Sequence, residues 1–171
     1  MPDDPDEILN RLDRVEDAFG GYTTGRPSYE EHLDPEANDS DVIQLRKACR
    51  LLDACRLLRE HDGYHTSVVE MSFAAIERSL EFYALHASND SIDDFREGHD
   101  RAYNRAASLG IFSAETAKRL KGVFARNRSA AYYRDTIAAA EQAERLFELA
   151  VAIHDHVTRF ARLSHECRCG Q

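Results

Sequence analysis

The stretch HTSVVEMSFAAIERSLEFYALHA, residues 65–87, decides the fold class. Its apolar positions alternate steps of four and three residues: Val69, Phe73, Ile76, Leu80 and Tyr83. This spacing places one continuous apolar stripe along an α-helix, as in the seam of a helical bundle. The turn-favouring residues 88–90, SND, then end the pattern. The stretch therefore predicts a long helix whose apolar face needs other helices to cover it.

The segments on both sides predict further helices. Apolar residues recur at helical spacing over residues 4–19, 42–60, 91–108, 114–126 and 135–162. Ser40 and Ser113 stand where N-caps are expected for two of these segments. The sequence contains no convincing strand, glycine-rich phosphate loop or internal repeat. We therefore expect an all-α, antiparallel four- to five-helix bundle with an N-terminal helical arm.

The 171 residues suggest three parts along one chain. Residues 1–40 hold an amphipathic helix, a Gly-Gly breaker and a polar linker. Residues 41–162 form the predicted bundle, which is long enough to bury a core without disulfide or metal staples. Residues 163–171 form a tail that contains cysteine and histidine.

The charge pattern limits the classes of partner. The net charge is −9, which argues against nucleic-acid binding by the whole surface. Basic residues are almost all arginine, as expected either for a salt-loving, haloarchaeal host or for a mesophile with a GC-rich genome. No apolar run approaches the roughly 20 residues of a membrane span. The acidic start lacks a secretory signal, so we expect a cytoplasmic protein with no membrane partner.

The four cysteines fall into two groups. Cys49 and Cys55 lie in an apolar helical pattern and are predicted to be core thiols. Cys167 and Cys169 lie in the tail, where they could hold a metal with His165. Zinc sites of this kind require a second ligand pair, and the spacing offers none. We therefore expect a frayed tail, no metal site and no cofactor.

A basic island interrupts the acidic chain between residues 116 and 134. It holds six basic residues and no acidic one: Lys118, Arg119, Lys121, Arg126, Arg128 and Arg134. Basic side chains near a helix C-terminus offset its negative end, which could explain two or three of them. An anion site, in which arginines contact phosphate, is the other explanation.

The island carries a resemblance to a known family. Arg126-Asn127, followed by Ala131 and Tyr133, resembles the signature of the HEPN family (higher eukaryotes and prokaryotes nucleotide-binding domain), which reads Arg, a polar residue, a spacer, His and often Tyr. A second registration, from Arg128 to Tyr133, resembles the Arg-x-x-Ala-Asp-Tyr pattern of one branch, with Tyr132 in place of Asp. The resemblance covers residues 42–160 and includes the helix at 65–87.

The HEPN resemblance implies a homodimer and a metal-independent endoribonuclease, often a toxin encoded beside a minimal nucleotidyltransferase antitoxin. It would place Arg126, Asn127 and Tyr133 in a catalytic site. It would place RNA or nucleotide phosphate on a set of basic residues: Lys121, Arg126, Arg128 and Arg134.

The sequence departs from the family pattern because Ala131 occupies the histidine position. A tyrosine with a pKa near 10 is a poor base at neutral pH, so Tyr132 does not replace it. Other histidines could reach the site, but the sequence places none there: His61, His65, His99, His154 and His156. The last two alternate along a helix and are expected to be solvated.

The sequence thus predicts a HEPN-like protein with a degenerate motif. It would bind RNA or nucleotide phosphate, or neutralise a nucleotidyltransferase partner. Two alternatives stay open. One is a ribonuclease that has kept its activity, and the other is an interaction bundle whose residues 1–40 engage another protein.

Overall fold

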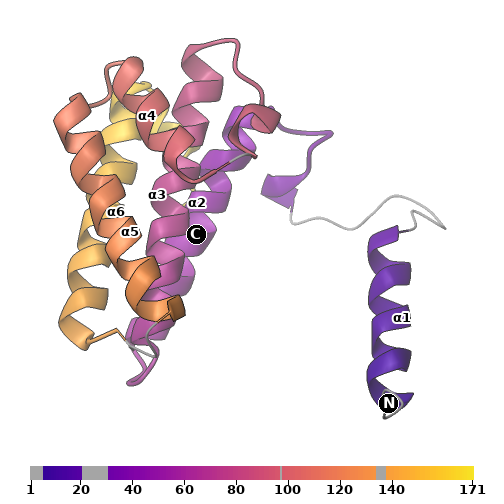
Figure 1. Cartoon of the computed structure of the whole chain (residues 1–171). Coiled ribbons are helices and arrows are strands. Elements are labelled where there is room, and N and C mark those ends of the chain that lie inside the picture. The colour runs from indigo at the N-terminus through magenta and orange to yellow at the C-terminus, as the bar shows by residue number, and fades with distance from the viewer. Residues whose placement is uncertain (1–5, 21–30, 97, 134–137) are drawn as a thin grey trace. The chain divides into compact units, whose positions relative to one another are not determined.

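The computed structural model describes residues 6–20, 31–96, 98–133 and 138–171, and these residues form helices joined by turns and loops, without any strand (Figure 1). This confirms the predicted all-α bundle. The helices are, in chain order, α1 (Asp6–Gly20), η1 (Glu31–Leu33), α2 (Ser40–Arg59), α3 (His65–Ala87), η2 (Ile92–Phe95), α4 (Asp100–Ser108), α5 (Ala114–Tyr133), α6 (Ala140–Phe160) and η3 (Ser164–Glu166).

The chain divides into two compact units, Met1–Glu30 and Glu31–Gln171. The first unit contains α1, an amphipathic helix as predicted, which buries none of its side chains. Its apolar residues are exposed, and Phe19 is 88% exposed. The second unit contains all the other described helices and the core.

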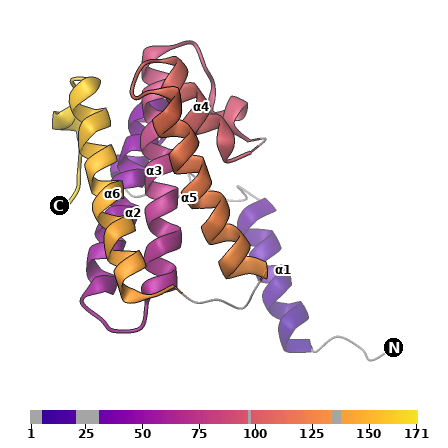
Figure 2. The same ribbon diagram turned by 60° about the vertical axis from the view of Figure 1, so that its left-hand side comes forward.

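The core of the second unit lies among α2, α3 and α6, with α3 in contact with both of the others (Figure 2). The apolar stripe predicted from the sequence of α3 is buried, as expected for a bundle seam. Leu45 and Leu52 of α2 and Ala150 and Val157 of α6 are fully buried in the same core. Burial of this apolar surface supplies most of the driving force for folding.

The pair α4 and α5 packs beside α3. Phe124 of α5 meets Phe73 of α3 edge to face, with ring centroids 5.2 Å apart. The chain turns between α4 and α5 at Gly110, whose φ of +81° is readily adopted only without a side chain. Ser113 then caps α5 as predicted, because its hydroxyl accepts the N–H of Thr116 at 3.1 Å.

Several predicted helix ends were wrong. The helix expected over residues 91–108 is two helices, η2 and α4, because Gly98 lies between them at a φ of +146°. The helix expected to end near Arg126 continues to Tyr133, since that stretch contains neither glycine nor proline. The final helix begins at Ala140 rather than at residue 135.

The C-terminal tail returns onto the bundle, so the prediction of a frayed tail was wrong. Arg162 adopts a left-handed φ of 59° after α6, and the N–H of Leu163 donates to the carbonyl of Thr158 at 3.0 Å. This is the hydrogen bond of a Schellman C-cap, which reverses the chain direction. Residues 164–171 then run back toward α2. None of the described helices is long and apolar enough to cross a membrane.

Candidate metal centre

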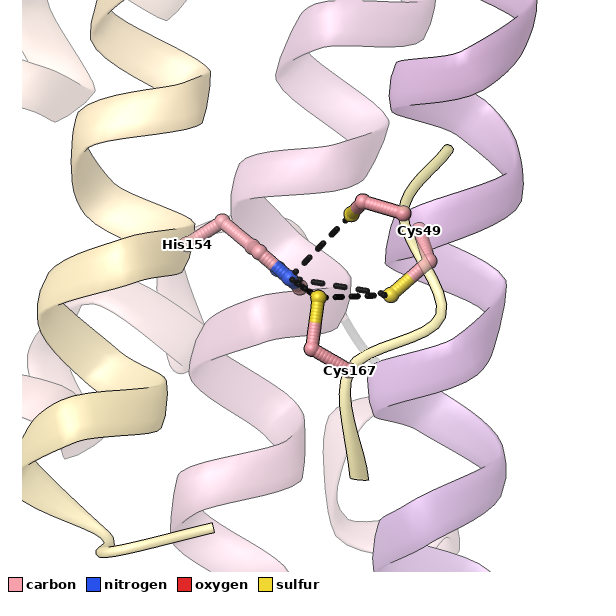
Figure 3. Close-up of side chains that lie close together, drawn as sticks. Cys49, His154 and Cys167 are labelled. Atoms are coloured by element: carbon pink, nitrogen blue, oxygen red, sulfur yellow. Dashed lines mark hydrogen bonds between the residues drawn. The ribbon is translucent and has the colours of Figure 1, made fainter. Parts of the chain in front are cut away.

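Three segments bring four potential metal ligands together where the tail meets α2 and α6. Figure 3 labels three of these ligands, Cys49, His154 and Cys167. Cys49 comes from α2, His154 from α6, and Cys167 and Cys169 from the returning tail. The three sulfur atoms and one ring nitrogen of these residues all lie within 4.8 Å of one another. A group of this composition is a Cys₃His ligand set.

Four of the distances within the cluster are close to those of a tetrahedral zinc centre, and all the ligand atoms lie within 4.8 Å of one another. His154 Nε2 lies 3.6 Å from Cys49 Sγ, 3.3 Å from Cys167 Sγ and 3.5 Å from Cys169 Sγ. The Sγ atoms of Cys49 and Cys167 are 3.6 Å apart. Zinc bonds of about 2.3 Å to sulfur and 2.0–2.1 Å to nitrogen place tetrahedral ligand atoms about 3.5–3.8 Å apart. The four ligand atoms therefore lie close enough together for one zinc ion to bind them all.

The ring of His154 is oriented from α3. Its Nδ1 lies 3.0 Å from the hydroxyl of Ser79, which itself donates to the carbonyl of Ala75 at 2.8 Å. Because the hydroxyl proton is used in that bond, Nδ1–H donates to Ser79 Oγ. The lone pair then lies on Nε2, the atom that faces the three thiols. Metal-binding histidines are generally fixed by such a hydrogen bond to the second nitrogen.

The cluster is deep on one side and accessible on the other. Cys49 and His154 are each 1% exposed, whereas Cys167 and Cys169 are half-buried. The backbone N–H of Arg168 donates to Cys49 Sγ at 3.2 Å, so the tail is bonded directly to the deep side of the cluster. A metal ion and a chelator would therefore reach the cluster from the tail side.

Without an ion, the thiols and the imidazole compete for protons. Hydrogen bonds with Cys169, Cys49 and His154 lower the pKa of the Cys167 thiol. Contacts with Cys167 and Cys49, together with burial, raise the pKa of Cys169. Burial lowers the pKa of His154, but hydrogen bonds with Cys167 and Cys49 outweigh it and raise that pKa to about 9. A bound cation would displace these shared protons, since metal ligands must be deprotonated.

Contacts on both sides of the tail cysteines fix the tail to α2. Glu166 accepts a hydrogen bond from the Arg46 guanidinium at 2.7 Å, and Arg46 has only 9% of its side chain exposed. The N–H of Gly170 donates to Asp53 Oδ1 at 2.9 Å, and Arg56 donates to the same oxygen at 2.6 Å. The sulfur atoms of Cys167 and Cys169 are thereby held near Cys49 by bonds that do not involve a metal.

A protein-family model described as a domain of unknown function, DUF8154, matches residues 3–169. The chain belongs to this family. The matched residues include all four members of the cluster. No curated protein and no solved structure matches the DUF8154 chain.

The sequence of the DUF8154 chain did not predict this cluster, and the expectation of no metal ligands in the tail was wrong. Its tail histidine, His165, is 69% exposed and lies outside the cluster, while His154, which was expected to be solvated, is buried. Cys49 was correctly predicted to be buried. The signal for His154 was present, because it follows Ala150 by four residues and precedes Val157 by three, on the apolar face of α6. Nothing local links Cys49 to Cys167, which lies 118 residues away.

The residues that the sequence predicted as a phosphate site lie on α5 of the DUF8154 chain. Arg126 and Arg128 are exposed, Asn127 is half-buried, and Lys121 Nζ donates to Asn104 Oδ1 at 2.7 Å. Arg134 lies outside the described residues, and so does the side chain of Tyr133, the last residue of α5.

One histidine lies close to this part of α5. The His99 ring centroid is 4.9 Å from that of Phe124, and the Arg128 guanidinium carbon is 6.0 Å from the same Phe124 centroid. His99 Nδ1 lies 3.0 Å from the Glu77 carboxylate. Burial raises the pKa of Glu77, although His99, Arg78 and Arg128 act in the opposite direction. The structure thus gathers a histidine, a carboxylate and an arginine around Phe124.

Proposed function

We propose that this DUF8154 protein binds one zinc ion through Cys49, His154, Cys167 and Cys169. The observation that carries the proposal is the set of four ligand atoms within 4.8 Å of one another. Three thiolates and one imidazole form a soft ligand set that favours zinc over magnesium, calcium or manganese. The oriented His154 ring supports the same assignment.

The role of the ion would be structural rather than catalytic. Catalytic zinc sites have three protein ligands and keep one position open for water or substrate, whereas structural sites are closed by four. Here the protein supplies four. The ion would join α2, α6 and the tail. It would thereby connect Cys49 to His154, 105 residues away in sequence, and to Cys167, 118 residues away. A reducing, cytoplasmic compartment would keep the three thiols available for it.

The test is the metal content of the purified protein. Inductively coupled plasma mass spectrometry should find about one zinc per chain, as expected for a single four-ligand site. After dialysis against a weak chelator, Cys49→Ser should lose the zinc. Cys55→Ser is the matched control, because Cys55 is equally buried on α2 but bonds to Val68 and Ser72 instead. A wild type without metal, or equal retention in both variants, would contradict the proposal.

A second function, binding of RNA or nucleotide phosphate in the manner of HEPN proteins, is supported by the surroundings of Arg128. Residues two apart on a helix point about 200° apart, so Arg126 and Arg128 face different sides of α5. The side of Arg128 is the one that His99 and Glu77 approach. This favours the registration that begins at Arg128 over the one that begins at Arg126.

In this second proposal Arg128 would hold a phosphate. His99, oriented by Glu77, would transfer the protons, because the motif itself contains no histidine for that role. Histidine suits that role because its pKa lies near neutrality. The protein would act as a homodimer, with RNA or a minimal nucleotidyltransferase as its partner. The interaction bundle without RNA remains the alternative.

RNA cleavage and RNA binding by Arg128→Ala, His99→Gln and Arg126→Ala separate these alternatives. If Arg128→Ala and His99→Gln lose RNA cleavage while Arg126→Ala keeps it, the result supports a catalytic site beside Phe124. Salt-sensitive binding without cleavage, weakened by Arg128→Ala, supports a binding module. Absence of both activities in the wild type contradicts an RNA function.

A further inference from the structure

The helix α1 presents an apolar face to its surroundings. The structure describes all 15 residues of α1, and none of them is buried. Five side chains form the apolar face: Ile8, Leu9, Leu12, Val15 and Phe19. Their exposed fractions run from 42% to 88%. A lone helix of about 15 residues is only marginally stable in water, so α1 gains stability from any partner that covers this face.

The spacing of the apolar face is that of a coiled coil. Its main residues follow one another in steps of four, three and four: Ile8, Leu12, Val15 and Phe19. This is the alternation of d and a positions in a heptad repeat, beginning with Ile8 at a d position. A seam of this kind packs against a helix that carries the same repeat. A second copy of α1 supplies that repeat.

The charges beside the seam favour a second copy in the parallel orientation. In this heptad Arg11 takes a g position, and Glu16 takes the e position of the next heptad. These positions face each other across a parallel coiled coil, so two α1 helices would form two Arg11–Glu16 ion pairs. In an antiparallel pair g positions face g and e positions face e. Glu16 would then lie beside Leu9, and neither ion pair would form.

The contact of Arg11 within α1 is compatible with this pairing. Its Nε lies 2.5 Å from the carboxylate of Glu7, and the two side chains are 73% and 70% exposed. An exposed pair of this kind contributes little to stability. A guanidinium carries five N–H donors, so Arg11 can bond Glu7 and a facing Glu16 at the same time.

The polar face of α1 disfavours a membrane as the partner. The helix contains five acidic residues and two arginines. Amphipathic helices that bind anionic lipid surfaces are instead rich in lysine and arginine. The charge of α1 therefore favours a protein partner with a matching seam over a lipid surface.

We propose that α1 is a dimerisation element, which binds the α1 of a second copy of this chain as a parallel coiled coil. The apolar seam supplies the attraction, and the Arg11–Glu16 pairs set the orientation. Two heptads make a short coiled coil, so the dimer forms reversibly and depends on protein concentration. The proposal rests neither on the zinc centre nor on the basic residues of α5, because α1 belongs to a separate unit.

Sedimentation equilibrium of the full chain from about 1 µM to about 0.5 mM tests this proposal. The wild type should pass from monomer to dimer over this range. Leu12→Glu places a charge in the seam and should weaken dimerisation at least about 100-fold. Asn10→Glu is the matched control, because it makes the same charge change at an exposed f position, away from the seam. It should change the dimerisation constant less than about twofold.

Charge exchange tests the parallel orientation. Glu16→Arg sets like charges against Arg11 in both pairs and should weaken the dimer about threefold or more at about 0.1 M salt. Adding Arg11→Glu to this variant reverses both pairs and should recover most of the affinity. A double variant that dimerises no better than Glu16→Arg alone would overturn the parallel pairing.

Two other results would overturn the dimerisation role of α1. One is a wild type that stays monomeric at every concentration. The other is a dimer that Leu12→Glu leaves intact, which would place the contact on another face. Hydrogen exchange separates a further case. If α1 covers its own bundle, its amides are protected to the same degree at all concentrations, whereas the proposal requires protection that rises with concentration.

Zinc content measured on the same samples separates this proposal from the proposed function. Leu12→Glu should keep its zinc, because α1 contributes no residue to the ligand cluster. Loss of the dimer with zinc retained assigns the effect to α1. A wild type that holds zinc and stays monomeric refutes the α1 contact alone, and a dimer that holds no zinc refutes the metal centre alone.

Discussion

The tail end of the bundle and the Phe124 region of α5 differ in how their reactive residues are held. At the tail, Ser79 fixes His154 and the Arg168 backbone bonds Cys49, while Glu166 and Gly170 fix the backbone on both sides of the tail cysteines. Around Phe124, His99 is half exposed and Arg128 extends from an exposed helix face. The tail therefore has a preorganised site, whereas the α5 region offers suitable side chains with less support. Preorganisation is what separates a metal site from a surface cluster.

Removal of the proposed zinc should have the largest effect on stability. A ligand present at 1,000 times its Kd stabilises the folded state by about 4 kcal/mol, which for a chain of this size corresponds to a Tm change of about 10 °C. Chelation of the wild type should therefore lower its Tm by about 10 °C in differential scanning calorimetry. Cys167→Ser should start from the lower Tm and respond little to the chelator. An unchanged wild-type Tm would mean that no bound metal stabilises the tail cluster, and it would contradict the difference between the two regions.

The orientation of His154 should have the next largest effect. Ser79→Ala removes the acceptor for Nδ1–H, and loss of such a partner typically weakens metal binding 10–100-fold. Competition with a chromogenic zinc chelator measures this change. Ser72→Ala is the control, because Ser72 is also fully buried on α3 but contacts Cys55. Equal zinc affinity in the two variants would show that Ser79 does not support the site.

The α5 region should show a smaller effect in RNA binding. If Arg128 contacts one phosphate, Arg128→Ala should reduce the slope of log K against log salt by about 1. Arg126→Ala should reduce it less, since it faces another side of α5. Fluorescence anisotropy over a salt series gives both slopes. Identical slopes in the two variants would mean that α5 acts only as a diffuse basic surface.

The smallest expected effects are two opposite pH dependences of stability. Burial raises the pKa of Glu77 above its usual value of 4.5. The favourable contribution of Glu77 to the free energy of unfolding is therefore present below about pH 4.5, and it is lost as the pH rises through the pKa of the folded state. Glu77→Gln should therefore gain stability relative to the wild type as pH rises above 4.5. Urea unfolding between pH 4 and 8 measures this trend, and a falling relative stability would contradict the buried position of Glu77.

Asp90 should behave in the opposite way. The bidentate hydrogen bond from Arg105, with one branch at 3.0 Å, lowers the pKa of Asp90. The contribution of Asp90 to the free energy of unfolding is present above 3.8, its pKa in the unfolded chain. This contribution is lost as the pH falls through the lower pKa of the folded state. Asp90→Asn should cost about 1 kcal/mol or less at pH 7, because solvent still screens this half-buried pair, and less at pH 3. A cost that grows toward low pH in urea unfolding would contradict this assignment.

The sequence predicted the fold well because the fold depends on local periodicity. The stripe from Val69 to Tyr83 is buried where the spacing placed it, and Ser113 caps α5. The prediction of helix ends was wrong where a glycine with a positive φ interrupts the helix, as at Gly98. The ligand cluster could not be predicted from local periodicity. Cys49 and Cys167 meet only because the chain reverses its direction at Arg162, after α6, and the tail runs back to α2. Arg126 and Arg128, although only two residues apart in sequence, face different sides of one helix.

Extended X-ray absorption fine structure at the zinc edge tests the central claim most directly. A zinc ion in the proposed centre should have a first shell of three sulfur atoms at about 2.3 Å and one nitrogen at about 2.0–2.1 Å. In Cys169→Ser one sulfur should be replaced by a lighter atom or the zinc should be lost, while Cys55→Ser should leave the spectrum unchanged. A shell of nitrogen and oxygen only, or one that Cys169→Ser leaves intact, would contradict a zinc ion held by Cys49, His154, Cys167 and Cys169.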